Sequence, residues 1–261
     1  MAAGRQHGRG AQLNRLNGRI ALITGASSGI GRGIANAFAR EGASIVVADR
    51  VQEARASEVL AEVRAHGREA LFVQTDVRDE SSVGAMAGAA LSRFGRVDIL
   101  VNNAGIFTES LLENLPIDDW DRVVNTNLRG TFLCTRALIG QMLERRDGRI
   151  INIASQLGQI GGKSVAHYVA SKAGVIGLTK ALAREVSSRG VLVNAIAPGP
   201  IDTPMLDDES DEWRRAKLAD LPIGRFGTVD EVTPTAVLLA SADGSYYVGQ
   251  TLGPNGGDVM L

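Results

Sequence analysis

Short apolar runs alternate with longer amphipathic segments from Gly18 to near the end of this 261-residue chain, and this alternation limits the folds open to it. The apolar runs are rich in β-branched residues, and most lack a polar side, as is typical of strands buried on both faces. Repeated strand–helix units of this kind form a parallel sheet covered by helices. The sequence therefore predicts an α/β fold: a doubly wound parallel sheet in a single domain, flanked by helices on both faces.

The element boundaries follow from the same pattern. Strands are predicted at residues 20–24, 44–48, 70–75, 99–102, 149–154 and 191–197. Helices are predicted at residues 30–40, 53–66, 81–94, 118–144 and 166–188, the fourth of which is long enough to be two helices with a bend near residues 125–127. Thr228 and Glu231 form a capping-box pattern that opens another helix through residue 240. Pro234 lies beyond the first turn of that helix, which predicts a kink or a later start.

A glycine-rich loop, residues 24–31, follows the first predicted strand and opens the first helix. Its spacing is Gly-xxx-Gly-x-Gly, which differs from the Gly-x-Gly-xx-Gly of other dinucleotide folds. Glycines in this setting let backbone amides at the positive end of a helix approach a pyrophosphate, whereas a structural turn needs only one or two. The loop predicts a phosphate site that includes Gly25, Ser27, Ser28, Gly29, Ile30 and Gly31.

The choice of cofactor depends on Asp49 and Arg50, which close the second predicted strand. A carboxylate at this place can bond the 2′-hydroxyl of the adenosine ribose and repel a 2′-phosphate, which favours NAD. The guanidinium of Arg50 can attract the same phosphate, so NADP stays open. Without a ligand the two residues are a polar strand exit. We expect NAD(H) to bind here.

Two further polar clusters follow predicted strands: Asp76 with Val77, and the Asn-Asn-Ala-Gly run at residues 102–105. Either cluster alone has the composition of an ordinary turn. Ligands of an open parallel sheet bind beyond the carboxyl ends of the strands. We therefore expect the adenine and the dinucleotide backbone to contact Asp76, Val77, Asn103, Ala104 and Gly105.

Tyr168 and Lys172 are four residues apart in a predicted helix and so share one helix face. A lysine ammonium about 4 Å from a phenol, at an effective dielectric of about 20, supplies roughly 4 kcal/mol of stabilisation to the phenolate. That energy corresponds to about three units of pKa, enough to let the phenol exchange a proton near neutral pH. An exposed tyrosine and a solvated lysine on a surface helix would give the same pattern.

Together these features resemble the short-chain dehydrogenase/reductase family. The features that carry the resemblance are the loop 24–31, the run 102–105, Ser155, Tyr168-xxx-Lys172 and Pro198-Gly199. They occur in order from about residue 16 to the carboxyl end. The resemblance implies a Rossmann-type fold and an oxidoreductase.

The resemblance also implies roles for single residues. Tyr168 is similar to the family's acid/base, and Lys172 to the group that lowers its pKa and contacts the nicotinamide ribose. Ser155 is similar to the hydroxyl that orients a substrate carbonyl, although alone it is a strand-end turn residue. Asn127 resembles the residue that holds a water in the proton relay, although alone it is a polar residue within a helix.

Contacts with the cofactor are implied in the same way. Gly25, Ser28 and Ile30 are expected at the phosphates, Asp49 at the ribose, and Asp76 and Val77 around the adenine. The nicotinamide is expected to be flanked by Pro198, Gly199, Ile201 and Thr203. The family also implies a homotetramer, and the apolar residues 259–261 are suited to packing at such an interface.

These residues favour hydride transfer between NAD(H) and a secondary alcohol or ketone, with Tyr168 as acid/base. The resemblance is strongest to 3-oxoacyl-carrier-protein reductases and to small secondary-alcohol or polyol dehydrogenases. An NADPH-dependent 3-oxoacyl-carrier-protein reductase is the alternative, and Asp49 argues against it. A cofactor-sensing binding protein without catalysis is an alternative of another class. Such a protein would not need Ser155, Tyr168 and Lys172 together.

Composition excludes several other functions. Cys134 is the only cysteine and the three histidines are scattered, so no internal disulfide can form and no metal site is expected. The formal net charge is -1 and no apolar stretch approaches about 20 residues, so we expect neither nucleic-acid nor membrane binding. A single cysteine fits a reducing cytoplasm, where we expect the protein to lie. Residues 1–15 form a basic segment that we expect to be a disordered tail before the oxidoreductase domain, residues 16–261.

Residues 204–221 mix six acidic residues with Met205, Leu206, Trp213 and Leu218. This mixture is suited to a mobile lid over an apolar ligand. Candidate substrate-pocket residues, chosen for their proximity in sequence to the proposed chemistry or to this lid, are Phe107, Gln156, Leu157, His167, Met205 and Trp213. Each of them is equally suited to packing or to solvent exposure, so the sequence defines neither the substrate nor the direction of the reaction.

Overall fold

The computed structural model describes residues 14–207 and 210–260. Residues 1–13, which make up most of the expected basic tail, lie outside the described residues. So do residues 208 and 209 of the expected lid and Leu261 of the apolar terminus.

Seven parallel strands of the described chain form one sheet in the order β3-β2-β1-β4-β5-β6-β7. They are β1 (Ile20–Thr24), β2 (Ser44–Asp49), β3 (Ala70–Gln74), β4 (Ile99–Asn102), β5 (Gly148–Ile153), β6 (Val191–Ile196) and β7 (Thr251–Leu252). The order reverses between β1 and β4, and Leu22 of β1 is paired with Val46 of β2 on one side and Leu100 of β4 on the other. This reversal is the topological switch point of the Rossmann-type fold, so the predicted doubly wound sheet is confirmed.

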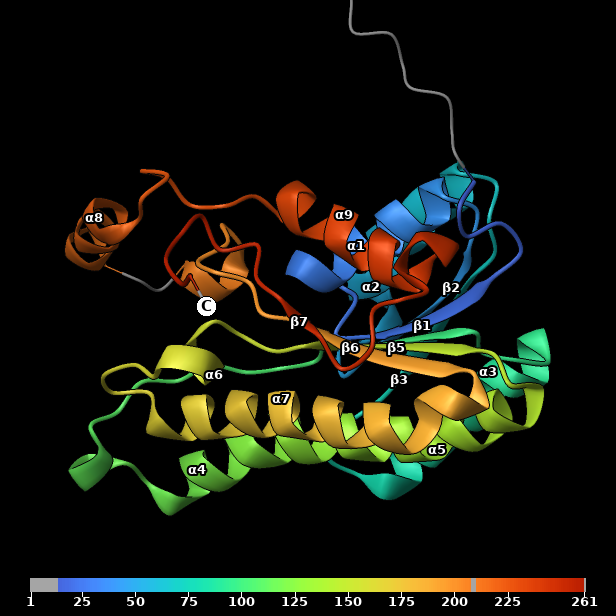
Figure 1. Cartoon of the computed structure of the whole chain (residues 1–261), viewed down its shortest axis with the longest axis horizontal. Helices are drawn as coiled ribbons and strands as arrows, with labels where there is room; N and C mark the ends of the chain where they lie inside the picture. The colour runs from blue at the N-terminus through green and yellow to red at the C-terminus, as the bar shows by residue number, and fades with distance from the viewer. Residues whose placement is uncertain (1–13, 208–209, 261) are drawn as a thin grey trace, which may run out of the picture.

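Helices cover both faces of the sheet. They are α1 (Gly29–Arg40), α2 (Glu53–Ala65), α3 (Glu80–Phe94), α4 (Ile117–Val124), α5 (Gly130–Arg145), α6 (Leu157–Ile160), α7 (Ala166–Val186), α8 (Asp211–Asp220) and α9 (Val229–Ala240). Short segments complete the order: η1 (Leu112–Asn114), η2 (Asn125–Arg129), η3 (Ser187–Arg189), η4 (Pro204–Leu206) and η5 (Ala242–Gly244). Figure 1 shows α1, α2 and α9 on one face and α4, α5 and α7 on the other.

Alternate residues of each central strand belong to opposite cores. Ile23 of β1 packs in the same apolar cluster as Phe38 of α1, whereas its neighbour Leu22 packs in a second cluster with Met86 of α3. All four side chains are fully buried. Because successive strand residues point to opposite faces, a strand covered by helices on both sides needs apolar residues throughout. This explains why the strands appear in the sequence as continuous apolar runs.

The predicted helix at residues 118–144 is interrupted, as the sequence suggested. Helix α4 ends at Val124, a π-helical segment η2 covers Asn125–Arg129, and α5 begins at Gly130. Thr131 Oγ1 donates a hydrogen bond to the Asn127 carbonyl oxygen at 2.8 Å within this irregular turn. π-Helical turns in longer helices are frequent at functional sites.

The capping box before α9 is present, with Thr228 as the N-cap and Glu231 at the third helical position. A later helix start was expected as one effect of Pro234, and that expectation is wrong, because the helix begins at Val229 and contains the proline. Pro234 has no N–H for the Asp230 carbonyl four residues earlier. The Thr233 hydroxyl donates to that carbonyl oxygen at 3.4 Å and replaces the missing donor in part.

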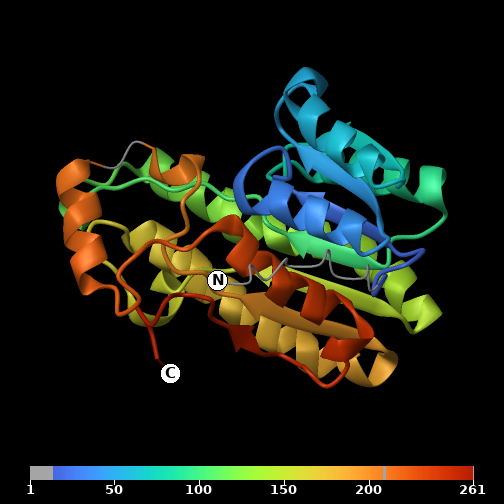
Figure 2. The same cartoon turned by 90° about the horizontal axis from the view of Figure 1, so that it is seen from above.

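The sequence reading missed α8 and β7. Helix α8 begins with Ser210 as its N-cap, and the Ser210 hydroxyl accepts a hydrogen bond from Trp213 N at 3.1 Å. Strand β7 has only two residues, which is too short to give a periodic pattern. Figures 1 and 2 show α8, α6 and the carboxyl-terminal segment at the same end of the molecule.

Candidate active site

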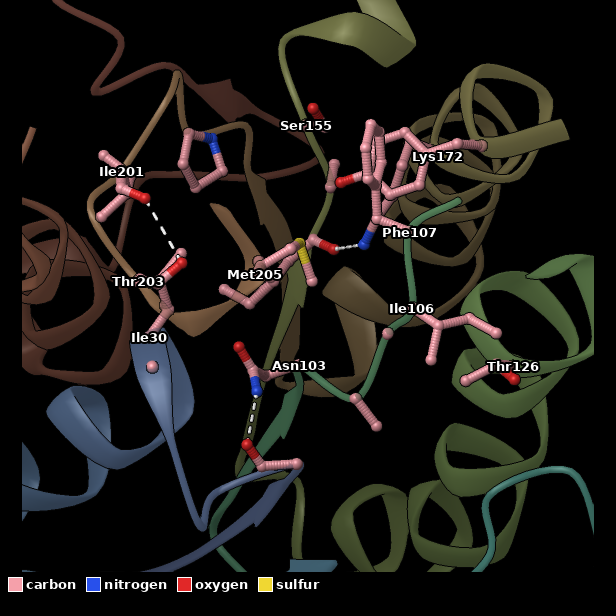
Figure 3. Close-up of a pocket in the computed structure, with 18 of the residues that line it drawn as sticks. Ile30, Asn103, Ile106, Phe107, Thr126, Ser155, Lys172, Ile201, Thr203 and Met205 are labelled. Atoms are coloured by element: carbon pink, nitrogen blue, oxygen red, sulfur yellow. Dashed lines mark hydrogen bonds between the residues drawn. The ribbon is translucent and has the colours of Figure 1, made fainter. Parts of the chain in front are cut away.

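A cavity of about 610 Å³ lies at the carboxyl ends of β1 to β6. Predicted site residues that line it are Gly25, Ser28, Gly29, Ile30, Asp49, Arg50, Asp76, Val77, Asn103, Ala104, Gly105, Ser155, Tyr168, Lys172, Pro198, Gly199, Ile201 and Thr203. In the view of Figure 3, Ser155, Phe107 and Lys172 lie on one side, and Ile30 and Asn103 on the other. The fold thus brings residues from six strand ends to one cavity.

The glycines of the phosphate loop are required by its geometry. Gly25 and Gly29 have φ angles of +65° and +52°, which non-glycine residues rarely adopt. A Cβ at Gly31 would lie 2.4 Å from the Gly25 carbonyl oxygen and 2.5 Å from Asn103 Nδ2. Gly31 is therefore needed for the packing of the loop and does not itself line the cavity.

Helix α1 begins at the cavity without a side-chain cap. Ser28 is its N-cap residue, and its hydroxyl accepts no capping hydrogen bond. The first amides of a helix need an acceptor from a cap, water or a ligand, and they favour an anion. Ser28, Gly29 and Ile30 all line the cavity, so this end of α1 fits a pyrophosphate.

Asn103 and Thr24 attach the phosphate loop to the end of β4. Asn103 Nδ2 donates to the carbonyl oxygens of Thr24 at 2.9 Å and Gly25 at 3.0 Å. The Thr24 hydroxyl accepts from the amides of Asn103 and Ala104, each at 3.0 Å. The amide group of Asn103, expected near the cofactor, therefore also fixes the loop that the cofactor would contact.

Asp49 lies at the end of β2 with Arg50 beside it, and both line the cavity. The Asp49 carboxylate accepts hydrogen bonds from the amides of Ser27 at 3.1 Å and Val51 at 3.4 Å. These bonds fix the carboxylate next to the phosphate loop. Ser27 itself does not line the cavity, and its amide supports Asp49.

Arg78 also lines the cavity and was missed by the sequence reading. Its guanidinium binds both carboxylate oxygens of Asp76, with Nε at 2.9 Å from Oδ1 and Nη2 at 2.5 Å from Oδ2. The Arg78 side chain holds the pKa of Asp76 below its usual value. The Asp-x-Arg spacing after β3 is visible in the sequence, but no sequence pattern predicts whether the arginine side chain points into the cavity.

Tyr168 is buried at the first turn of α7, with 8% of its surface exposed. The ring of Phe107 packs edge-on against it, with ring centroids 5.0 Å apart and an interplanar angle of 84°. Tyr168 and Phe107 both line the cavity, and Tyr168 is hydrogen-bonded to Ser155, so the pair forms one wall beside Ser155. Phe107 and the candidates Gln156, Leu157, Met205 and Trp213 are confirmed as lining residues.

Lys172 lies one helical turn from Tyr168 and is 5% exposed. Its Nζ donates to the Ile153 carbonyl oxygen at 2.7 Å and lies 5.7 Å from the centroid of the Tyr168 ring. Burial lowers the pKa of Lys172 to about 8. The two residues therefore share a face of α7, as their spacing predicted.

The expected depression of the phenol pKa is wrong for these residues taken alone. Burial raises the pKa of Tyr168, and a hydrogen bond with Ser155 lowers it by less. The prediction considered the charge of Lys172 and left out the loss of water around the phenol, which penalises the charged form. The protein by itself therefore holds Tyr168 protonated.

Ser155 follows β5 and is 8% exposed. Its Oγ accepts a hydrogen bond from the Leu157 amide at 3.2 Å and also shares a hydrogen bond with the Tyr168 phenol. Both hydroxyls lie in the same cavity as the uncapped end of α1. They are placed to bind one oxygen atom of a ligand together.

Asn127 lies in the π-helical segment and is 1% exposed. Its Oδ1 accepts from the Ile106 amide at 2.9 Å, and its Nδ2 donates to the Ile106 carbonyl oxygen at 3.0 Å and to Ser171 Oγ at 3.1 Å. A Cβ at Gly105 would lie 3.3 Å from Asn127 Oδ1 and 3.6 Å from Lys172 Nζ. Asn127 is therefore close to Lys172 but behind the cavity wall.

The loop after β6 carries the residues expected at the nicotinamide, and all four line the cavity. A Cβ at Gly199 would meet the Asn255 backbone at 2.7 Å, so this position needs glycine for close packing. Ile201 forms an isolated bridge with Gly227, and Thr203 precedes η4. Met205 and Trp213, from η4 and α8, also line the cavity.

His167 was expected at the substrate pocket, and this expectation is wrong. The side chain is fully buried, and its Nε2 lies 2.7 Å from Thr108 Oγ1. Neighbouring helix residues point about 100° apart, so a helix that directs Tyr168 into the cavity directs His167 elsewhere. Burial lowers the pKa of His167.

No group of three or more histidine, cysteine, aspartate or glutamate side chains within residues 14–207 and 210–260 is arranged to hold a metal ion. In the same part of the chain, no helix has the length and apolar character needed to cross a membrane.

Comparison with known proteins gives matches over nearly the whole chain. Residues 19–214 match the family described as short chain dehydrogenase. The 3-oxoacyl-[acyl-carrier-protein] reductase FabG of Staphylococcus aureus is 45% identical over 242 residues, which are 93% of this chain and 98% of that protein. FabG of Thermotoga maritima is 40% identical over 246 residues, 94% of this chain and 100% of that protein. The crystal structure of a short-chain type dehydrogenase/reductase from Mycobacterium marinum has a TM-score of 0.91 at 35% identity and covers 96% of this chain and 99% of that one.

Proposed function

The chain belongs to the short chain dehydrogenase family, and from that premise we propose that it transfers a hydride between NAD(H) and a secondary alcohol or its ketone, with Tyr168 as acid/base. It is an oxidoreductase that acts on CH–OH groups with NAD or NADP. The observation that carries the proposal is the phenol of Tyr168, buried beside Ser155 in the same cavity as the uncapped end of α1.

The cofactor, Tyr168 and Ser155 would each have a separate role in the reaction. When bound, the nicotinamide supplies or accepts the hydride and, in its oxidised form, adds a positive charge. The buried phenol of Tyr168 is protonated, which suits donation to the oxygen of a ketone as that oxygen becomes an alcohol. The Ser155 hydroxyl donates a hydrogen bond to the same oxygen, and this hydrogen bond becomes stronger as negative charge develops on the oxygen.

Lys172 stabilises the phenolate that remains after the proton has left. Its pKa of about 8 keeps the amine protonated at neutral pH, so its charge opposes the effect of burial on the phenolate. Asn127 fixes the Ile106 backbone beside Lys172, and we assign it the expected place in the relay of protons toward solvent.

Replacing Tyr168 with Phe tests the proposal, because Phe keeps the packing with Phe107 and removes only the hydroxyl. We expect kcat to fall by about a hundredfold to ten-thousandfold. Binding of NADH, measured by fluorescence titration, should stay within about twofold of the unchanged protein, since ring packing is preserved. Activity retained by the Tyr168→Phe protein would refute the acid/base role of Tyr168.

The proposed cofactor is NAD, because the Asp49 carboxylate is fixed where it can accept hydrogen bonds from ribose hydroxyls and repel a 2′-phosphate. Arg50 and Arg78 line the same part of the cavity and are the groups that would favour NADP. Equilibrium binding of NADH and NADPH to the same preparation separates the two. Tighter NADPH binding would reverse the choice, and Asp49→Ser should weaken the preference for NADH.

A second candidate function has its own support. Relatives 40–45% identical to this chain carry the name 3-oxoacyl-[acyl-carrier-protein] reductase. The candidate reaction is reduction of a 3-oxoacyl thioester at the same Tyr168 and Ser155, usually with NADPH in this group of enzymes. A panel of secondary alcohols, polyols and 3-oxoacyl thioesters, each followed by NADH or NADPH absorbance, distinguishes the two functions by the ratio of kcat/KM.

We also propose a domain of residues 16–261, a lid at residues 204–221 and assembly into a homotetramer in the cytoplasm. The lid is supported by Met205 and Trp213, which line the cavity. Assembly is supported by apolar surface near β7 and at the carboxyl end: Tyr246 is 98% and Met260 78% exposed. Sedimentation velocity of the purified protein tests it, and a monomer would contradict it.

A further inference from the structure

Asp258 joins three segments that are distant in sequence. Its Oδ2 accepts a hydrogen bond from Gln156 Nε2, which follows Ser155 at the end of β5. The same oxygen is 2.6 Å from Lys217 Nζ on α8. The Asp258 side chain is only 10% exposed, so both contacts are shielded from solvent. Figures 1 and 2 show α8 and the carboxyl-terminal segment at the same end of the molecule.

Helix α8 has little apolar packing of its own. None of its residues is buried, and the half-buried ones are Trp213, Arg214, Lys217 and Leu218, which share one face. Trp213 lies 6.2 Å from the ring of Phe226, and Arg214 donates to the Leu206 carbonyl oxygen at 2.6 Å. A helix without buried residues depends on such contacts for its position. Lys217, which lines the cavity, provides the contact with Asp258.

Asp258 also sets the orientation of Gln156, a cavity-lining residue that is 3% exposed. Its Nε2 faces the carboxylate, and its Oε1 is buried without a hydrogen-bond partner among the described residues. Turning the amide over would place Oε1 against the negatively charged carboxylate, which is unfavourable. The amide therefore has one stable orientation next to Ser155, set by a residue near the end of the chain.

We propose that Asp258 is a positioning residue for substrate binding: its carboxylate couples the cover helix α8 to the Ser155–Gln156 loop and so holds the substrate side of the cavity closed. The inference rests on the proposed function, because it concerns the affinity for the substrate of that reaction. Asp258 touches neither the phosphate loop nor Tyr168 in the contacts described, so its effect is on substrate binding and not on the proton.

The test compares Asp258→Asn with Lys217→Met, the double variant and Asp220→Asn. Asp220 is an exposed carboxylate at the end of α8 and outside the cavity lining, so it is the matched control. We expect Asp258→Asn to raise KM about tenfold, with kcat and the Kd for NADH within about twofold, since tenfold corresponds to the loss of one charge-assisted contact. The double variant should be little worse than Asp258→Asn alone, because both substitutions remove the same ion pair and only Asp258→Asn also removes the negative charge that faces Gln156.

Hydrogen exchange of residues 211–220 gives a readout that does not need activity. We expect faster exchange in Asp258→Asn and Lys217→Met than in Asp220→Asn, with unchanged exchange in α7. Additive effects on KM, or α8 exchange equal to that of the control, would overturn the proposal. If no substrate is found, faster exchange of α8 still supports the coupling while the proposed function fails, so the two failures can be told apart.

Discussion

Helices α7 and α8 border the same cavity but are held in opposite ways. Helix α7 has 21 residues, of which nine are buried, including Tyr168 and Lys172. Helix α8 has ten residues, and none is buried. Apolar burial is the main stabilising contribution in folding, so the free energy of local opening should differ greatly between the two helices.

This difference separates two tasks. The groups proposed to move a proton need fixed distances, and they lie on a helix packed against β5 and β6. The groups that cover the substrate must admit and release it, and they lie on a segment with few buried contacts. Lids of enzymes are drawn from the least stable parts of their folds for the same reason.

Gly31→Ala tests the fixed side of the cavity and should have the largest effect. The new Cβ would lie 2.4 Å from the Gly25 carbonyl oxygen, which is backbone and cannot turn away. We expect the free energy of unfolding, measured in urea, to fall by about 3 kcal/mol because the phosphate loop must shift. The Kd for NADH should rise at least about tenfold for the same reason.

Gly88→Ala is the matched control for this substitution. Gly88 lies in α3, where a Cβ would meet nothing within 4 Å. Alanine favours a helix over glycine, so we expect a gain of roughly 0.5–1 kcal/mol with no change in NADH binding. Equal effects of the two substitutions would mean that the loop is not tightly packed.

Lys172→Met tests the buried charge on α7 through the pH dependence of stability. Below about pH 8, Lys172 is protonated in the folded and unfolded chain, and the folded state bears the cost of burying the charge. Between about pH 8 and the ordinary lysine value of 10.5, the folded chain releases this proton while the unfolded chain keeps it, so stability rises with pH. From pH 7.5 to 9.5, the unchanged protein should therefore gain about 1–2 kcal/mol relative to Lys172→Met.

Urea unfolding of both proteins at several pH values measures this difference. Titrating groups that lie far from Lys172 contribute equally to the two proteins and cancel in the comparison. A constant difference between the proteins across the range would contradict a lowered pKa for Lys172.

Trp213→Ala tests the cover and should have the smallest effect on stability. Trp213 is half-buried and packs against Phe226 on a helix without buried residues. We expect the free energy of unfolding to fall by less than about 1 kcal/mol, whereas KM for substrate should rise because the side chain lines the cavity. A loss near 3 kcal/mol would place α8 among the well-packed elements and remove the contrast with α7.

The secondary structure followed from the sequence wherever the pattern was strong and local. The first and fourth strands were predicted with the observed boundaries, and the capping box before α9 and the break near residues 125–127 are both present. These features depend on residues within a few positions of each other, so a single sequence contains the required information. Strand β7, with two residues, has no such pattern and was found only in the structure.

The sequence predicted most residues of the candidate site, but it did not predict the direction in which the pKa of Tyr168 shifts. The phosphate loop, Asp49, Ser155 and the pair Tyr168 and Lys172 were named from the sequence, and the structure brings them to one cavity. Arg78 was missed and His167 wrongly included, because both depend on the direction in which a side chain points.

Local patterns in the sequence account for the strand–helix alternation, the positions that require glycine in the phosphate loop, and the shared helix face of Tyr168 and Lys172. The packing of the folded chain sets the direction in which the pKa of Tyr168 shifts, because burial comes from Phe107 and other residues far along the chain. It also decided the contact between Gln156 and Asp258, which are 102 residues apart. Local patterns act over a few residues, whereas desolvation and long-range pairing depend on what the folded chain places nearby.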